Sequence, residues 1–250
     1  MKPDWVPILC YHRVCPESEF GPDPGSLCVT PGQFGRQLAL LKALGYRTVT
    51  LADLAAYLKA QKNLPPRSVA LTFDDGYADN CVHAFPLLKK HGFTATVFLV
   101  TDRIGGTNVW DSGKVPLLNE DQIVRMRDGG VHFGSHSAGH ADLSRSDPGT
   151  IRRELSDSLE KVRGLCGRMD VPFCYPYGRP GPAAKAAARE LGYLCALSTD
   201  TGSDTDQSGD LFEMRRVQVF PSTTLSGFWK KLQPWYPRWQ KFQKKLKSSF

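Results

Sequence analysis

The feature that most constrains the fold is an alternation of strand-like and helix-like segments between residues 6 and 222. Short apolar runs, each followed by a turn and then by a stretch with helical periodicity, recur about seven times. Such alternation predicts a parallel sheet covered by helices, and this number of units favours a closed or nearly closed barrel over an open sheet. A chain of 250 residues that is 41% hydrophobic can form such a barrel as one α/β domain.

Individual segments can be placed from their periodicity and their turn residues. Thr30 is expected to cap a helix, with Pro31 at its first position and Gln33 completing a capping box, and Gly45 ends that helix. Further helices are expected at 51–61, 79–91, 120–128, 148–165 and 182–191. Strands are expected at 7–12, 46–50, 69–73, 95–100, 131–134, 172–175, 194–198 and 214–220.

Two adjacent carboxylates follow the apolar strand at 69–73. The strand ends on Asp74 and Asp75, and Gly76 comes next. Neighbouring strand residues point to opposite faces, but both carboxylates can face one site where the strand gives way to a turn, which Gly76 permits. One carboxylate could then hold a metal while the other moves protons. Asp-Asp-Gly is also ordinary turn sequence, so this interpretation needs support from elsewhere in the chain.

A pair of histidines follows another strand. His136 and His140 are four residues apart, so they can share a helical face or a tight turn and reach one cation. Taken singly, each would more often be a polar residue with an ordinary partner. Together with a strand that ends on two carboxylates, they predict a metal site of two imidazoles and one carboxylate. That ligand set suits zinc or another borderline divalent cation and leaves a position open for water.

A third strand end carries the sequence Phe-Cys-Tyr-Pro-Tyr-Gly at 173–178. Pro176 and Gly178 predict a sharp turn that can present backbone N–H groups toward the site. With all three segments in view, the chain resembles the polysaccharide deacetylase family (carbohydrate esterase family 4) over residues 6–222. The resemblance implies a distorted (β/α)7 barrel, similar to a TIM barrel, as the catalytic domain. Residues 223–250 would then form a separate basic, amphipathic segment.

The resemblance assigns roles residue by residue. Thr-Phe-Asp-Asp-Gly at 72–76 matches the family's first motif, and His-Ser-x-x-His at 136–140 matches its second. Asp75, His136 and His140 would be the metal ligands, and Asp74 would be the general base.

The third motif is retained only in part, as Pro-Tyr-Gly at 176–178. The backbone N–H of Tyr177 would help to stabilise the oxyanion there. Cys174 stands where many members have an arginine that orients the base, so another cation, Arg216 or Arg215, is expected to supply that charge.

The family's late histidine, usually the general acid, is also missing, because no histidine follows His140. His12 lies in a Leu-x-Tyr-His segment that resembles the opening motif of the subgroup including the biofilm poly-N-acetylglucosamine deacetylases. This resemblance would place His12 near the site, where it could assist leaving-group protonation or substrate binding.

The activity that the resemblance implies is metal-dependent hydrolysis of an acetyl or similar acyl group from an N-acylated sugar. The sugar would belong to a polysaccharide or to a lipid-linked glycan precursor. Two alternatives remain: hydrolysis of another non-peptide amide or of an acetyl ester on the same scaffold, and an inactive carbohydrate-binding relative. The intact Asp75, His136 and His140 argue against an inactive relative.

Charge and cysteine usage limit the partners and the compartment. Seven basic and no acidic residues lie in 228–250, so the net charge of +7 comes from the tail, and this distribution argues against a nucleic-acid binder. No Gly-x-Gly-x-x-Gly or Walker-type loop supports nucleotide binding. Seven cysteines without a CxxC pair predict reduced thiols, and no secretory leader is recognisable, which together predict a cytoplasmic protein.

Some other conspicuous residues have simple interpretations. Asp200, Asp204 and Asp206 are expected to be solvated turn residues, although one of them could line the substrate cleft. Trp110 could stack on a sugar ring or serve in packing. Cys174 is expected to be a small buried apolar residue and not a nucleophile.

The C-terminal tail allows two interpretations. From position 238 onward its apolar positions 239, 242, 246 and 250 follow a helical stripe among basic residues. The helix could dock this stripe on the barrel. It could instead lie in the interface of an anionic membrane and hold the enzyme there, at the cytoplasmic face, through residues 228–250.

Overall fold

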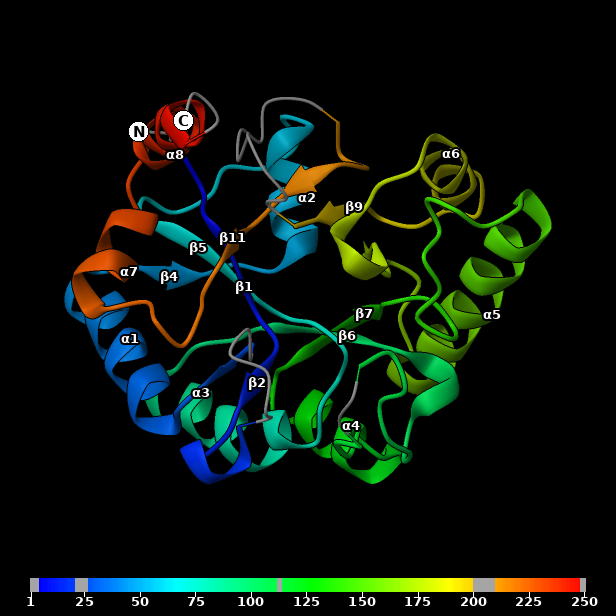
Figure 1. Ribbon diagram of the computed structural model, residues 1–250, viewed down its shortest axis with the longest axis horizontal. Helices are drawn as coiled ribbons and strands as arrows, with labels where there is room; N and C mark the ends of the chain where they lie inside the picture. Colours follow the sequence, from blue (N-terminus) through cyan, green and yellow to red (C-terminus); the bar gives the residue numbers. More distant parts are fainter. Residues whose placement is uncertain (1–4, 21–26, 112–113, 200–209, 248–250) are drawn as a thin grey trace.

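The computed structural model describes residues 5–20, 27–111, 114–199 and 210–247 of the chain. Its main sheet is a ring of parallel strands with helices around the outside (Figure 1). In spatial order the strands are β10 (Met214–Arg215), β9 (Ala196–Ser198), β8 (Phe173–Cys174), β7 (His132–Ser135), β6 (Thr96–Leu99), β5 (Ser68–Phe73), β1 (Ile8–Tyr11) and β11 (Val217–Gln218). The predicted α/β barrel, nearly closed and in one domain, is confirmed.

The ring is closed by one short stretch of chain. Strands β10 and β11 are separated only by Arg216, yet β10 pairs with β9 at one end of the sheet while β11 pairs with β1 at the other. The single strand expected at 214–220 is therefore two short strands. The bend at Arg216 lets the chain change neighbours, and it directs the Arg216 side chain into the barrel, where it is fully buried.

Three further strands lie outside the ring. Strand β4 (Arg47–Thr48) pairs with the start of β5, whereas β6 pairs with the end of β5, so the two share one edge of that strand. Strands β2 (Arg13–Val14) and β3 (Cys28–Val29) form a small parallel pair after β1.

The helices follow the predicted order with small changes at their ends. They are α1 (Pro31–Ala43), α2 (Leu51–Leu58), α3 (Phe85–His91), α4 (Glu120–Asp128), α5 (Pro148–Cys166), α6 (Pro182–Glu190), α7 (Leu225–Lys231) and α8 (Tyr236–Lys247). The capping box of Thr30 and Gln33 is formed as predicted. The helix expected at 79–91 begins instead with a π-helical turn at Asn80–Ala84, because Pro86 has no N–H to continue an α-helical ladder there.

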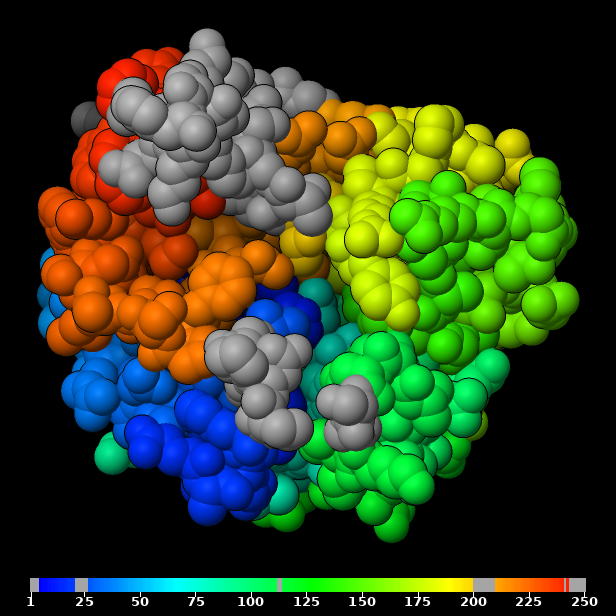
Figure 2. Space-filling view, in the orientation of Figure 1, coloured from blue at the N-terminus to red at the C-terminus, as the bar shows by residue number. Residues whose placement is uncertain are grey.

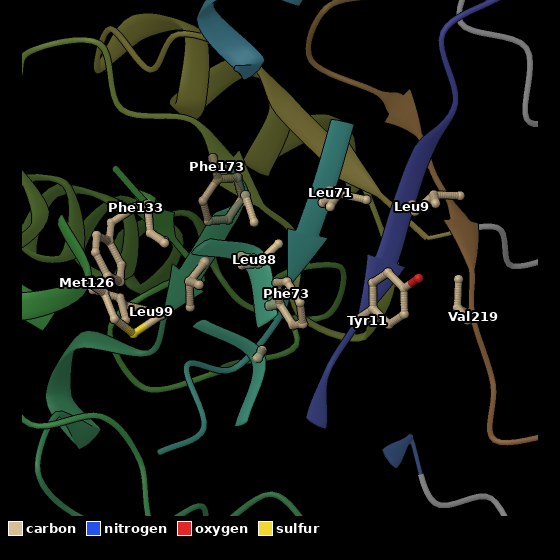
Figure 3. Packing of buried hydrophobic residues seen from close by; sticks show 14 of the residues in the cluster. Leu9, Tyr11, Leu71, Phe73, Leu88, Leu99, Met126, Phe133, Phe173 and Val219 are labelled. Atoms are coloured by element: carbon tan, nitrogen blue, oxygen red, sulfur yellow. The ribbon is translucent and has the colours of Figure 1, made fainter. Parts of the chain in front are cut away.

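The period of two along the strands divides the core into two layers. Leu9, Tyr11, Leu71 and Phe73 point outward from β1 and β5 into the apolar layer beneath the helices (Figure 3). The alternate residues of the same strands fill the barrel interior, together with residues from other strands: Ile8, Ala70, Phe98, Cys174 and Leu197. The residue that follows Phe73 is therefore directed inward, and it is Asp74.

One prediction about the cysteines is wrong. Cys15 and Cys28 form a disulfide that joins the loop after β2 to β3. Spacing alone did not reveal this pair, because the two residues are brought together by the pairing of β2 with β3. Five cysteines are free, as expected for reduced thiols. The compartment stays a prediction, although a disulfide favours an oxidising one over the cytoplasm.

The C-terminal segment folds against the barrel. Helix α7 packs beside α1, and the buried Phe228, Leu232 and Tyr236 anchor α7 and α8 to the main core. Figure 2 shows the C-terminal segment, in orange and red, on the surface of the molecule beside the blue N-terminal part. Within the described residues, no helix is both long enough and apolar enough to cross a bilayer. The division of the chain at residue 222 stays a prediction.

Candidate active site

The predicted site residues meet at one edge of the barrel. His12 follows β1, Asp74 and Asp75 follow β5, and His136 follows β7. Tyr177 lies in the short turn Pro176–Gly178 after β8. Carboxyl ends of parallel strands form a common edge, which explains how segments more than 100 residues apart in the sequence assemble one site.

Asp74 points into the barrel and is held by Arg216. The Arg216 guanidinium donates two hydrogen bonds to the carboxylate, Nη1 to Oδ1 at 2.6 Å and Nη2 to Oδ2 at 2.7 Å. Burial alone would raise the pKa of Asp74, but the charge and hydrogen bonds of Arg216 lower it to about 2. Asp74 is therefore an ionised, oriented proton acceptor at neutral pH.

Arg216, and not Arg215, is thus the cation that accompanies Asp74. Arg215 points elsewhere and donates to Glu213. The Cys174 thiol lies 3.0 Å from Nη2 of Arg216 and 3.7 Å from Oδ2 of Asp74. Burial raises the pKa of this thiol, so Cys174 is a neutral buried side chain, as predicted. Arg216 reaches Asp74 from the bend between β10 and β11.

The Cys10 thiol is a contact that the sequence did not indicate. It lies 3.6 Å from Oδ2 of Asp74, because Cys10 faces the barrel interior one strand away. The only sequence signal for this contact is that alternate residues of β1 face the barrel interior. Thr72 completes the surroundings of Arg216 by accepting a hydrogen bond from Nη1 at 3.1 Å.

Asp75 turns away from Asp74 toward the two histidines. Its φ of 70° lies in the left-handed region, so the backbone does not continue the strand and the carboxylate faces the loops above the barrel. Oδ1 of Asp75 is 3.4 Å from Nε2 of His136 and 3.3 Å from Nε2 of His140. All three side chains are buried.

The hydrogen bonding of His136 defines which atom faces Asp75. Its Nδ1 lies 2.8 Å from the carbonyl oxygen of Cys174, which can only accept, so Nδ1 carries the proton. In neutral His136 the Nε2 lone pair is then directed at a carboxylate oxygen. Two acceptors this close in a buried site repel each other unless a proton or a metal cation lies between them.

The arrangement therefore fits a metal ion. One carboxylate oxygen and two imidazole nitrogens lie within 4.8 Å of one another. This donor set is typical of zinc and related divalent cations. The buried Nδ1 of His140 has no hydrogen-bond partner among the described residues, so nothing in this part of the chain fixes the tautomer of His140.

Strained backbone is concentrated at the site. Asp75, Ser137, His140 and Tyr177 all have φ between 58° and 70°, a region costly for residues other than glycine. Gly178 also has a positive φ, and a Cβ there would collide with the side chain of Thr199. The loops are thus held in one conformation that directs these side chains at a common point.

Aromatic rings border the histidines. Trp110 stacks on His140 with ring centroids 4.2 Å apart. This contact confirms that Trp110 serves in packing, whereas its stacking on a sugar ring stays a prediction. Tyr177 also contacts His140, edge-on with ring centroids 4.8 Å apart, and is 44% exposed. His140 therefore packs against two aromatic rings, one of which is partly open to solvent.

His12 lies beside Asp74, and so near the site as the resemblance implied. Its Nε2 is 3.9 Å from Oδ2 of Asp74. Burial lowers the pKa of His12, although Asp74 and Asp75 oppose that effect, so the imidazole is neutral at pH 7. A neutral imidazole beside a carboxylate can accept and relay a proton. Asp200, Asp204 and Asp206 lie outside the described residues.

Comparison with known proteins gives a consistent result. The sequence model of the family described as "Polysaccharide deacetylase" matches residues 61–196. The "Putative polysaccharide deacetylase YxkH" of Bacillus subtilis is 30% identical over 227 residues, which are 91% of this chain and 76% of that protein. A poly-beta-1,6-N-acetyl-D-glucosamine N-deacetylase of Staphylococcus epidermidis is 37% identical over 60% of this chain, and the match spans 54% of the staphylococcal enzyme's length.

Two solved structures share the fold over nearly their whole length. The Streptococcus pyogenes deacetylase PplD, in complex with acetate, has a TM-score of 0.79 and 25% identity, with 93% of this chain and 100% of that chain covered. IcaB from Ammonifex degensii has the same TM-score and identity, with 93% and 98% covered. Together with the match to the family model and the barrel described above, these likenesses show that the chain belongs to the polysaccharide deacetylase family.

Proposed function

We propose that this protein is a metal-dependent N-deacetylase that removes acetyl groups from an N-acetylated polysaccharide or lipid-linked glycan. The observation that carries the proposal is the separation of two adjacent carboxylates into two environments. Asp75 faces two imidazole nitrogens, whereas Asp74 is held by Arg216. Metal-assisted hydrolysis needs both a cation site and a nearby base.

Asp75, His136 and His140 would hold the cation. When bound, the cation supplies a Lewis acid that polarises the amide carbonyl and makes water more acidic. Asp74, ionised and oriented by Arg216, accepts the proton of the attacking water. Nε2 of His12, 3.9 Å from Asp74, is placed to pass a proton toward the departing nitrogen. The backbone N–H of Tyr177 donates to the oxygen on which charge develops.

The relatives support the substrate class. The staphylococcal enzymes are named for poly-β-1,6-N-acetyl-D-glucosamine, and the Streptococcus pyogenes enzyme binds acetate, which is the product of deacetylation. We infer that this chain acts on N-acetylated glucosamine units.

The test is acetate release by protein stripped of metal and then loaded with Zn²⁺, Co²⁺ or Mn²⁺. N-acetylglucosamine oligomers, a lipid-linked N-acetylated sugar and an O-acetylated sugar are compared as substrates. We expect release from the N-acetylated sugars by loaded protein only, with the Asp74→Asn variant as the control. Activity only on the ester would favour the esterase alternative, and no release with any metal would favour an inactive relative.

A further inference from the structure

The C-terminal helices expose a group of large aromatic side chains. Trp229, Trp235, Trp239 and Phe242 are 42%, 42%, 39% and 62% exposed. The rings of Trp229 and Trp235, and those of Trp235 and Trp239, have centroids 6.4 Å apart. These four rings are not needed to pack the helices on the barrel, because Phe228, Leu232 and Tyr236 already anchor α7 and α8 to the core. We call these four residues the aromatic surface.

The segment that carries the aromatic surface has charges of one sign. Residues 225–250 contain seven lysines and arginines and no aspartate or glutamate. Lys230 and Arg238 are exposed and form no ion pair with any residue that the structure describes, and Nζ of Lys230 lies 5.8 Å from the ring centre of Trp239. Exposed tryptophans beside uncompensated cations match the interface of an anionic bilayer, where rings lie at headgroup depth.

The aromatic surface lies at the end of the barrel opposite the site. In the first turn of α1, Nε2 of Gln33 donates a hydrogen bond to the carbonyl oxygen of Pro221. Just after α1, the hydroxyl of Tyr46 donates a hydrogen bond to the carbonyl oxygen of Leu232. The segment 221–232 therefore runs beside α1 from its start to its end. Tyr46 leads directly into β4, so Leu232 lies where strands begin, whereas the site residues follow strand ends. In Figure 1 the arrow of β1 points away from α8.

We propose that the aromatic surface docks on an anionic phospholipid bilayer and that the catalytic edge then faces away from the membrane. This inference rests on the proposed function only for what the site does. It favours a long N-acetylated polymer in the aqueous phase over a sugar on the lipid headgroup. The deacetylated polymer does not suit the aromatic surface, because its glucosamine units carry ammonium groups that the lysines would repel.

Cosedimentation with vesicles tests the docking. The full chain is mixed with vesicles of phosphatidylcholine alone or with phosphatidylglycerol added. We expect binding to the anionic vesicles only, weakening as salt shortens the Debye length below about 10 Å. The triple variant Trp235→Ala/Trp239→Ala/Phe242→Ala should lose about tenfold or more in partitioning. The matched control Val82→Ala/Val124→Ala/Met169→Ala removes three exposed apolar side chains elsewhere and should bind as the wild type does.

A second pair of variants covers the case in which the triple variant misfolds. Lys230→Glu/Arg238→Glu should lose anionic binding, whereas Lys90→Glu/Arg153→Glu, which reverses two exposed cations on α3 and α5, should lose much less. Thermal melts verify folding. The proposal would be overturned if wild-type protein did not bind anionic vesicles at low salt, or if the triple variant bound them as strongly as the wild type. A wild-type dimer that the triple variant dissociates, or polymer binding that depends on these aromatic residues, would also overturn it.

Orientation has its own readout. Vesicle-bound wild type should release acetate from a soluble oligosaccharide as fast as free protein, because the catalytic edge faces water. A loss of activity on binding would contradict the orientation while leaving the docking intact. Unchanged activity of the triple variant on the same oligosaccharide separates a failure of this proposal from a failure of the proposed function.

Discussion

Asp74 and Asp75 are consecutive in the sequence, both buried and chemically identical, yet they face different partners. Asp74 continues the inward period of β5 and meets a permanent cation, Arg216. Asp75 leaves the strand through a left-handed φ and meets two imidazole nitrogens. The comparison shows how the fold gives two neighbouring carboxylates different partners: one residue outside the strand conformation leaves the first carboxylate beside a guanidinium and turns the second toward two imidazoles.

Removing one of the proposed metal ligands should have the largest effect. We expect Asp75→Ala, His136→Ala and His140→Ala each to abolish both metal binding and turnover, because two donors do not hold the cation. Asp74→Asn should keep the metal and lose about 10²- to 10⁴-fold in rate. Elemental analysis of the purified variants, with acetate release, checks the split. Loss of metal from Asp74→Asn, or full activity of His140→Ala, would show that the two carboxylates do not divide the roles as proposed.

Removing the cation on the base side comes next. Arg216→Met leaves Asp74 buried without its partner, which costs about 3–5 kcal/mol of unfolding free energy. Arg216 holds the pKa of Asp74 at about 2, so in the variant burial dominates and the pKa rises. Asp74 is then protonated at a higher pH than in the wild type. The acidic limb of the pH–rate profile should therefore shift to higher pH. Arg215→Met is the matched control, and an unmoved acidic limb in Arg216→Met would rule out this role for Arg216.

His12 gives a smaller effect on the same side of the comparison. His12→Gln keeps a polar side chain beside Asp74 but cannot relay a proton, so turnover should fall about tenfold or more with bound metal unchanged. Steady-state kinetics together with metal content tests this. Unchanged kinetics would return His12 to a structural role.

The smallest effect is expected at Cys174. Its neutral thiol contacts Arg216 and Asp74 but is not needed for the ion pair, so Cys174→Ala should cost about 1 kcal/mol of stability and leave turnover nearly unchanged. Thermal melts and acetate release measure the two quantities. Complete loss of activity with the fold intact would mean that the thiol takes part in the reaction.

The sequence predicted much of this arrangement because its signals are local. The barrel follows from strand and helix periods, and the positions of Asp75, His136 and His140 follow from two short motifs at strand ends. The disulfide of Cys15 with Cys28, and the Cys10 contact to Asp74, were not predictable because both depend on which strands become neighbours. The choice of Arg216 over Arg215 depends in the same way on where the chain bends between β10 and β11.

That bend has a consequence for how the protein loses activity. The residue that lets the chain pass from one end of the sheet to the other is also the residue that keeps Asp74 charged. Any fluctuation that parts β10 from β9 or β11 from β1 would pull the guanidinium from the carboxylate before a helix needs to melt. On heating, catalytic activity should therefore be lost at a lower temperature than the helical circular dichroism signal, because local opening of the sheet at this bend is enough to separate Arg216 from Asp74.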